Sequence, residues 1–293
     1  MISEETLKKI RKLEIISRKA ARDIFAGQYH SAFKGRGMEF SEVREYQFGD
    51  DIRFIDWNVS SRLGRLFIKQ FVEERELTII LAIDLSASLQ FVSASKSKKD
   101  IAVELSALIA FTAMLNNDKV GLLIFTDRVE VFIPPKKGRT HLLRLIRDIS
   151  EFQPQGRGTA IASALAYLTS LLKKKAVVFL ISDFLDENFA TALKIAARKH
   201  DLIAIAIHDR RELAAPRRGI FQLKDLENGE DFSADFSRAA VRSAYQNISS
   251  SRSERLNDIF RKYAIDAITI LSETDYEKPL FDLFLQRRHK FAR

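Results

Sequence analysis

The 293-residue sequence contains no cysteine, one tryptophan, three methionines and five prolines. Without cysteine, the chain cannot form disulfides, thiolate metal sites or a thiol nucleophile. Its five histidines are scattered and none are paired at helical spacing, so we expect no zinc site. These absences exclude the thiol-based classes of enzyme and metal site.

Long hydrophobic runs are also missing. A membrane helix needs roughly 18 uninterrupted apolar residues, whereas the longest runs here, "LTIILAI" and "AVVFLI", suit buried strands. The opening "MISEETLKKIRKLEIISRK" alternates charged with apolar residues and lacks the hydrophobic segment of a signal peptide. We therefore expect no membrane span and a cytoplasmic protein.

The excess of positive charge is modest and diffuse. The net charge is +9, and only the terminal "QRRHKFAR" has basic residues without any acidic one. A segment that ends a chain is expected to be frayed and solvated. A basic surface that binds nucleic acid stays an alternative, but a solubilising surface is the favoured interpretation, with no nucleic-acid partner.

Apolar residues make up 46% of the chain, and after residue 76 their pattern alternates between strand and helix. Strands that are apolar throughout and alternate with helices predict an α/β fold with a doubly wound, mostly parallel sheet, Rossmann-like, with one antiparallel edge strand. The expected strands are 77–84, 119–126, the antiparallel 128–135, 176–183, 202–209 and 267–272, and the expected helices include 96–116, 138–151, 159–173 and 187–199. A hairpin around "LENGED", a long helix and a terminal helix complete the prediction.

The first 76 residues do not show this alternation of apolar strands and helices. Apolar positions three and four apart predict a helix over 3–26 that ends at Gly27. Residues 35–76 consist of short β-prone pieces that continue into the first strand without a Gly-, Pro- or Ser-rich break. We predict two regions, 1–76 as a helix with a small β-rich extension and 77–293 as the α/β domain, with the extension part of the folded body.

The extension also holds a block of charged residues around its single tryptophan. Trp57 is expected to anchor a core, which is the more frequent role of a lone tryptophan. The charged residues have two open interpretations, pairing with one another or facing a partner, and they are Asp50, Asp51, Arg53 and Asp56.

Three segments place oxygen-bearing side chains where predicted strands end. Asp84 begins "DLSAS" after the first strand, Thr159 opens a helix in "GRGTA", and Asp183 ends a strand in "ISDF". Binding sites of open parallel sheets form outside the carboxyl ends of the strands. Extended spacing puts Asp84, Ser86 and Ser88 on one side of the backbone, so one carboxylate and two hydroxyls converge.

These five side chains offer only oxygen ligands, which describes a hard-cation site and favours Mg²⁺ or Mn²⁺. Two carboxylates balance a divalent cation only if both bind it directly. With water between the ion and either carboxylate, the metal stays electron-poor and favours another anionic ligand from outside. The sequence therefore predicts a cation that attracts an acidic partner.

The order D-L-S-A-S, then Thr159, then Asp183 resembles the metal-ion-dependent adhesion site of von Willebrand factor type A domains, with the pattern D-x-S-x-S…T…D. The resemblance implies that Ser86 and Ser88 ligate the ion directly and that Thr159 joins in one conformational state. It also implies that Asp84 and Asp183 act largely through water, while an Asp or Glu of a partner takes the open position.

A longer block, "REYQFGDDIRFIDWNVSSRLGRLFIKQFVEERELT", resembles domain-of-unknown-function family 58, and "PPKKGRTHLLRLI" and "LKDLENGED" are similar to that family too. Members combine this segment with a type A domain and resemble partners of MoxR-type AAA+ ATPases. The resemblance implies an adaptor for such an ATPase in the assembly or remodelling of other proteins. Many relatives carry membrane helices ahead of this block, and the soluble helix here argues against carrying membrane attachment over.

Two other interpretations compete with the metal site. Ser86, Ser88 and Thr159 are residue types that commonly cap helices, although the ordered set of five favours the metal. Asp84 after the first strand would also suit the nucleophile of a metal-dependent phosphohydrolase. That chemistry commonly uses a second carboxylate two residues on, where this chain has Ser86. We therefore expect a non-enzymatic interaction protein.

Overall fold

The computed structural model describes residues 12, 14–17, 19–21, 39–72, 76–91, 96–214, 216–224, 226 and 229–291. The chain divides into two compact units, one of Met1–Ala32 with Leu77–Arg293 and the other of Phe33–Glu76. This division cuts the predicted region 1–76 at residue 32. That residues 35–76 belong to the folded body and do not form a detachable module stays a prediction.

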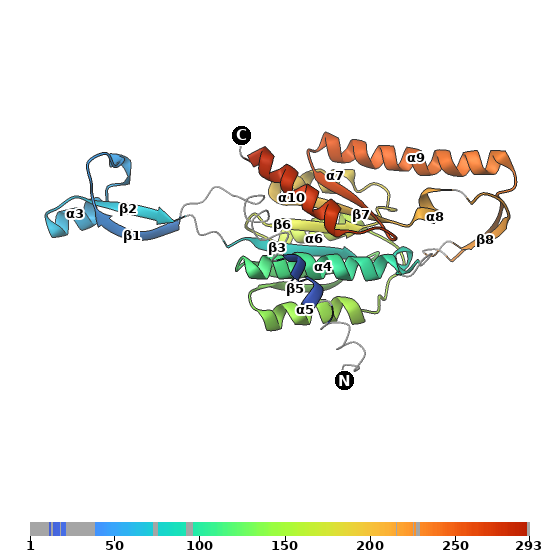
Figure 1. Ribbon diagram of the computed structural model, residues 1–293, viewed down its shortest axis with the longest axis horizontal. Helices are drawn as coiled ribbons and strands as arrows, with labels where there is room; N and C mark the ends of the chain where they lie inside the picture. The colour runs from blue at the N-terminus through green and yellow to red at the C-terminus, as the bar shows by residue number, and fades with distance from the viewer. Residues whose placement is uncertain are drawn as a thin grey trace. The chain divides into compact units, whose positions relative to one another are not determined.

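The larger unit is built on a six-stranded sheet with helices on both faces (Figure 1). Its strand order is β10-β7-β6-β3-β4-β5, and every neighbouring pair is parallel except β4 with β5. The strands are β3 (Thr78–Asp84), β4 (Lys119–Phe125), β5 (Val129–Lys136), β6 (Val177–Ser182), β7 (Asp201–His208) and β10 (Asp266–Leu271). The predicted α/β fold, with one antiparallel edge strand, is confirmed.

The core lies on both faces of the central strand β3, where residues 79–83 are fully buried. One face packs against α6 (Ile161–Leu171), α7 (Ala190–Lys199) and α9 (Ala239–Lys262). The remaining helices are α4 (Lys98–Leu115), which contacts β3, β4 and β7, α5 (Arg139–Glu151), which packs on α4 and β4, and α10 (Glu277–Phe291), which packs on β10. None of the helices in the described part of the chain combines the length and apolar character that crossing a bilayer requires.

The parallel register brings the carboxyl ends of neighbouring strands to one edge of the sheet. Asp84 at the end of β3 lies opposite Phe125 at the end of β4. His208 at the end of β7 lies opposite Leu271 at the end of β10. Ser182 ends β6 between β3 and β7. Residues just past these ends therefore share one edge, as the sequence pattern requires.

Between β7 and β10 the chain forms α8 (Arg210–Leu213), the hairpin of β8 (Ile220–Lys224) and β9 (Asp231–Asp235), and the long helix α9, which Figure 1 shows along the top of the unit. Two side chains of α9 hold α8 in place. The Tyr245 hydroxyl donates to the Arg211 carbonyl at 2.9 Å, and the Ser249 hydroxyl donates to the Glu212 carbonyl at 3.3 Å. The short helix α8 is thus fixed between the sheet edge and α9.

The described residues of the predicted first helix are helical at 12, 14–17 and 19–20. Glu14 accepts two hydrogen bonds from the Arg139 guanidinium at the start of α5, at 2.7 and 2.8 Å. Gly27, the predicted end of this helix, lies outside the described residues.

The smaller unit pairs β1 (Glu39–Glu45) with β2 (Phe67–Val72) in antiparallel fashion. Between them lie the 3-10 turn η2 (Ile52–Phe54) and the helix α3 (Trp57–Leu63), which the β-prone texture did not predict. Asp56 caps α3 by accepting from two backbone N–H groups, and Gly64 ends it with a left-handed φ of 66°. Trp57 is 68% exposed, so the expectation that it anchors a core was wrong.

The charged block of the smaller unit is satisfied within that unit. Asp50 forms a two-fold hydrogen-bonded ion pair with Arg44, at 2.7 and 2.8 Å. Asp51 pairs with Arg53 at 2.6 Å. The guanidinium partners hold the pKa of both carboxyls below the usual range. Pairing with neighbours is therefore the arrangement the structure shows.

The basic end of the chain is only partly as expected. Arg287, on α10, is 2% exposed and forms ion pairs with Asp201 at the start of β7 and with Asp266 at the start of β10. Arg287 Nη1 lies 2.6 Å from Asp266 Oδ2. This residue therefore fastens the terminal helix to the sheet, which corrects the expectation of a solvated tail at this position.

Candidate functional site

The site is centred on Asp84, which is fully buried at the end of β3. Its Oδ1 accepts a hydrogen bond from the Ser86 N–H at 2.9 Å, and its Oδ2 accepts one from the Ser182 hydroxyl at 2.7 Å. Burial, together with the charge of Asp183, raises the pKa of Asp84 to about 7. The carboxyl is thus held in a defined orientation but is costly to ionise.

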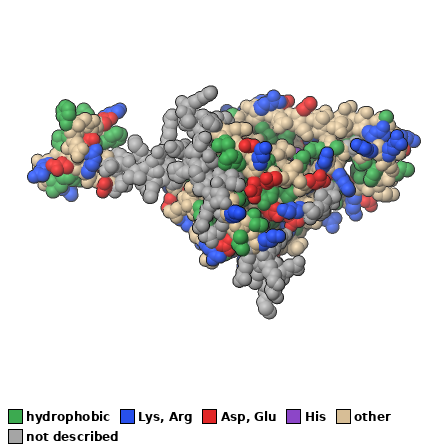
Figure 2. Space-filling view, in the orientation of Figure 1, with side chains coloured by type: hydrophobic (Ala, Val, Ile, Leu, Met, Phe, Trp, Pro, Cys, Tyr) green, Lys and Arg blue, Asp and Glu red, His purple; other side chains and the backbone are tan. Residues whose placement is uncertain are grey.

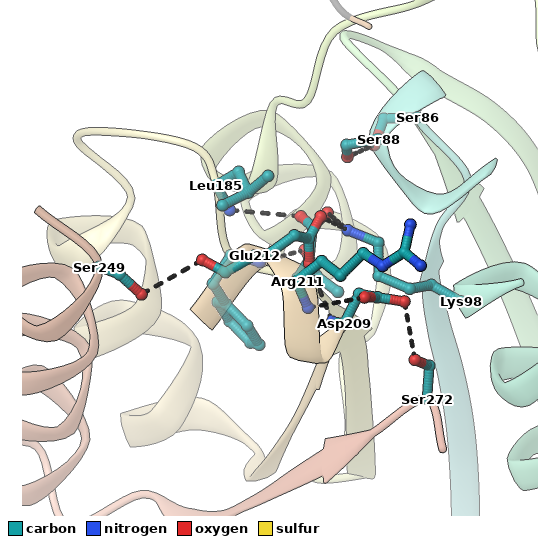
Figure 3. Close-up of polar contacts among 12 residues, drawn as sticks. Ser86, Ser88, Lys98, Leu185, Asp209, Arg211, Glu212, Ser249 and Ser272 are labelled. Carbon is teal, nitrogen blue, oxygen red and sulfur yellow. Dashed lines mark hydrogen bonds and ion pairs between the residues drawn. The ribbon is translucent and has the colours of Figure 1, made fainter. Parts of the chain in front are cut away.

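The hydroxyls of Ser86 and Ser88 lie together beside this carboxyl. Their Oγ atoms are 3.0 Å apart and both side chains are buried (Figure 3). Ser86 precedes the 3-10 turn η3 (Ala87–Gln90) but its side chain makes no capping bond. It hydrogen-bonds the Asp84 carboxyl instead, which works against the rise in the pKa of that group. The predicted convergence of one carboxylate and two hydroxyls is present, and the capping role of Ser86 is not.

Thr159 lies on a loop that is held against this segment. The Ala87 N–H donates to the Arg157 carbonyl at 2.9 Å, and the Ala160 N–H donates to the Thr126 carbonyl at 2.8 Å. Thr159 itself is half-buried between these two anchors.

The helix after this loop, α6, begins at Ile161 and not at Thr159 as expected. Its first turn is capped from elsewhere, because Asp186 Oδ2 accepts from the Ile161 N–H at 2.8 Å. The N-cap residue, Ala160, makes no side-chain capping bond. The helix therefore begins two residues later than the sequence predicted.

Asp183 follows β6 and is fully buried. Its Oδ1 accepts from the Leu185 N–H at 3.3 Å, and its Oδ2 pairs with Lys98 Nζ at 2.8 Å. Lys98 is also fully buried, and its ammonium lies 2.6 Å from Glu212 Oε1 on α8. Figure 3 shows the Lys98 side chain reaching toward Glu212, below Ser86 and Ser88.

The charges of this cluster influence one another strongly. Burial lowers the pKa of Lys98, but the carboxylates of Asp183 and Glu212 outweigh it and the net direction is upward. Burial raises the pKa of Glu212 in spite of the ammonium beside it. Lys98 therefore carries its charge in the folded protein, and that charge is the cluster's internal counter-ion.

A pocket of about 170 Å³ opens next to Asp183 and Glu212. Apolar side chains of α9 and of the loop after β6 line much of it, including Phe184, Ile248 and Leu256. Burial lowers the pKa of His208, which also lines the pocket, to about 4. The site thus borders an uncharged imidazole and an apolar wall on the side of α9.

The structure brings Asp84, Ser86 and Ser88 together, with Asp183 close enough to influence the ionisation of Asp84. Sequence reasoning missed Ser182, Lys98 and Glu212. Ser182 stands directly before Asp183, so its position at the strand end was a usable signal. Lys98 and Glu212 carried none, because they lie 114 residues apart and each resembles a solvated residue near a helix start.

The residues present fit a hard cation in part. In the part of the chain that the structure describes, no cluster of three or more His, Cys, Asp or Glu side chains is arranged to hold a metal. Two hydroxyls must therefore contribute, and Ser86 and Ser88 with Asp84 supply oxygens of the kind that Mg²⁺ and Mn²⁺ prefer. Asp183 is engaged by Lys98 and is turned to that ammonium.

A family model described as "Protein of unknown function DUF58" matches residues 42–255. The chain belongs to the DUF58 family. This DUF58 chain is 32% identical over 243 residues to the uncharacterized protein Rv1480 of Mycobacterium tuberculosis, which covers 79% of this chain and 77% of that one. The family relationship predicted from the block around Trp57 is confirmed.

Solved structures are similar to part of this DUF58 chain. An aerotolerance-related membrane protein from Bacteroides fragilis matches with a TM-score of 0.50 and 16% identity, over 73% of this chain and 99% of that one. The VWA domain of SpRpn10 matches with a TM-score of 0.37 and 12% identity, over 72% of this chain and 94% of that one. The similarity to the Bacteroides fragilis protein concerns the fold alone. The TM-score of the SpRpn10 match is too low to support any argument.

Proposed function

We propose that this DUF58 protein is a non-enzymatic interaction module that binds Mg²⁺ or Mn²⁺ directly through Ser86 and Ser88, with Asp84, Thr159 and Asp183 around the ion. The observation that carries the proposal is the pair of buried hydroxyls of Ser86 and Ser88, 3.0 Å apart, of which the Ser86 hydroxyl hydrogen-bonds the Asp84 carboxyl. The bound ion would supply a Lewis acid with an affinity for carboxylates, and an acidic side chain of another protein would be its external ligand.

The charge of the cluster supports a cation. The ammonium of Lys98 pairs with Asp183 and Glu212, and the charge of Asp183 raises the pKa of Asp84. These three carboxyls and one ammonium have an excess of two negative charges when all are ionised. Buried charges without counter-ions are costly, so the protein relieves them by taking up protons or a cation. The pKa of Asp84 is raised to about 7, so this carboxyl takes up a proton more readily than an exposed aspartate does. A divalent ion would balance the same charge.

The alternative of a phosphohydrolase acting through Asp84 has less support. Both carboxyl oxygens of Asp84 accept hydrogen bonds and the side chain is fully buried, so an attacking lone pair is not presented to a substrate. We expect no turnover of a generic phosphomonoester in the presence of Mg²⁺. Turnover that Asp84→Asn abolishes would favour the enzyme instead.

The nucleic-acid alternative also has less support. Figure 2 shows acidic and basic side chains interspersed over the middle of the α/β unit, without separation by sign. Arg287, in the basic terminal segment, is buried against two aspartates and is not available to a phosphate backbone. A polyanion surface would require basic side chains free to contact phosphates.

The partner we propose is a MoxR-type AAA+ ATPase, a client protein of that ATPase, or both, with this protein acting as a cytoplasmic adaptor in assembly or remodelling. This part rests on the resemblance of the sequence to DUF58 relatives of that kind. The proposed ion adds one requirement, which is that the partner offers an Asp or Glu to it.

The partner proposal is tested by binding of a purified MoxR-type ATPase from the same organism to this protein under three conditions. We expect binding in Mg²⁺, loss of binding in EDTA, and recovery when Mg²⁺ or Mn²⁺ is restored, because the ion joins two acidic surfaces that repel each other without it. Moderate salt should reduce the affinity only slightly, since a directly bound carboxylate is screened little. Binding that survives EDTA but fails at a few hundred millimolar salt, roughly the polyelectrolyte range, would contradict the metal bridge.

A further inference from the structure

Lys98 occupies a position that three physical effects disfavour. It is the first residue of α4, after the N-cap Ser97, where the positive end of the helix dipole repels a cation. It is fully buried, so its ammonium has lost its hydration. Its four-carbon side chain is also held in one conformation, at a cost in entropy. Among the described residues, its carboxylate partners Asp183 and Glu212 offset these costs.

The first partner, Asp183, is a residue that the proposed cation site would use. The Lys98 ammonium donates to Asp183 Oδ2 at 2.8 Å, and the Leu185 N–H donates to Asp183 Oδ1 at 3.3 Å. Both oxygens of Asp183 are therefore engaged inside the protein. The Lys98 ammonium thus binds the Asp183 carboxylate, which would otherwise be available to the divalent ion or to a water on that ion.

The second partner, Glu212, gives the ammonium a fixed second anchor. Glu212 Oε1 is 2.6 Å from Lys98 Nζ, and Oε2 accepts from the Asp209 N–H at 2.9 Å in the capping box of α8. The backbone of α8 is itself held by Tyr245 and Ser249 of α9. An ammonium released by Asp183 thus keeps one carboxylate partner, which makes exchange at Asp183 less costly than the loss of a sole ion pair.

We propose that Lys98 is a resident cation that competes with the divalent ion for Asp183 and thereby sets a low affinity of the site for that ion. The inference rests on the proposed function, because it concerns the same cation site. In the absence of the ion, Lys98 stabilises Asp183. When the ion binds, Asp183 is shared between the two cations, and part of the ammonium's interaction energy is lost.

A charge-matched double variant separates this competition from the general effect of removing a positive charge. Lys98→Met/Glu212→Gln removes one ammonium and one carboxylate, so the net charge around the site is unchanged while Asp183 Oδ2 loses its ammonium partner. We expect Mg²⁺ to bind the double variant at least about tenfold more tightly than wild type in calorimetric titration, since one ion pair at Asp183 no longer opposes it. We also expect Mg²⁺ to raise its melting temperature more than that of wild type.

Three further variants accompany the double variant. Lys96→Met removes a positive charge two residues away, from an exposed ion pair with Glu104, and should leave the Mg²⁺ affinity within about twofold of wild type. Lys98→Gln/Glu212→Gln has the same charge balance as the Met variant and replaces it if that protein does not fold. Ser86→Ala/Ser88→Ala, introduced into the double variant, should remove the tightened binding.

The outcomes distinguish the two proposals. Tighter Mg²⁺ binding in the charge-matched variant supports the competition. Wild-type affinity in that variant, with binding still lost in Ser86→Ala/Ser88→Ala, overturns the role of Lys98 and leaves the cation site standing. Absence of Mg²⁺ and Mn²⁺ binding in wild type and in every Lys98 variant overturns the cation site and the competition together.

Discussion

Ser182 donates a hydrogen bond of 2.7 Å to Asp84 Oδ2, from the end of β6 to the end of β3, and both side chains are fully buried. The same arrangement recurs two strands away, where the Ser272 hydroxyl after β10 donates to Asp209 Oδ2 after β7 at 2.9 Å. Each of these buried strand-end aspartates is thus supported by a serine at the end of a neighbouring strand. The sheet edge provides the donors that a buried carboxyl needs.

Loss of the Ser182 hydroxyl should destabilise the fold. Ser182→Ala leaves Asp84 Oδ2 without that donor, and an unsatisfied buried acceptor costs about 1–3 kcal/mol. We expect a decrease of this size in the free energy of unfolding, measured by urea denaturation at fixed pH. The control is Ser170→Ala, an exposed hydroxyl on the Tyr167 carbonyl, which should change stability by less than about 0.5 kcal/mol. Equal stability of the two variants would show that Asp84 does not depend on Ser182.

Arg287 should be a major source of stability for the terminal helix. Arg287→Met leaves Asp201 and Asp266 without their shared cation, and removing one partner of a buried ion pair costs about 3–5 kcal/mol. Arg261→Met removes an exposed pair with Asp258 and should cost less than about 1 kcal/mol. Chemical denaturation of both variants measures the difference. A decrease in unfolding free energy for Arg287→Met as small as that for Arg261→Met would show that Arg287 contributes no more than a solvated surface residue.

His208 should make the protein sensitive to acid. Its folded pKa is lowered to about 4, first by burial and then by the charges of Lys98 and Arg252, while Asp183 acts in the opposite direction. An unfolded histidine titrates near 6.5, roughly, so the unfolded chain binds more protons between these two pH values. Stability linked to His208 is therefore complete above about pH 6.5 and is lost as the pH falls toward about 4.

The variant His208→Gln isolates this contribution. The difference in unfolding free energy between wild type and His208→Gln should shift by up to about 3 kcal/mol between pH 7 and pH 4. Denaturant titrations at several pH values in this range provide the comparison. Parallel pH profiles for the two proteins would contradict the burial of a neutral His208.

Most of the fold was predictable because its strands are nearly uniform in their apolar character. The runs that became β3, β6 and β7 are buried along almost their whole length, which is the pattern of a parallel sheet covered on both faces. The helix α3 was missed because its sequence is rich in residues of weak helix propensity. Its cap at Asp56 and its end at Gly64 were the signals available.

The candidate site was predictable only where its residues are close in sequence. The spacing of Asp84, Ser86 and Ser88 already defines their convergence. Lys98 was not predictable, because "KSKKD" resembles a solvated first turn and nothing local separates Lys98 from its neighbours. Its partner Glu212 is 114 residues away, and such a pair is created by the packing of α4 and α8 at the sheet edge, not by a local pattern.

The central claim is that a divalent cation binds between Ser86, Ser88 and Asp84, and calorimetric titration with Mg²⁺ and Mn²⁺ tests it most directly. The matched control is Ser170→Ala/Ser250→Ala, which removes two hydroxyls that bond only local helix carbonyls. We predict a single binding site in wild type and in this control, and loss of that site in Ser86→Ala/Ser88→Ala with the fold intact by circular dichroism. Binding of either metal to Ser86→Ala/Ser88→Ala with the affinity of wild type would contradict the account.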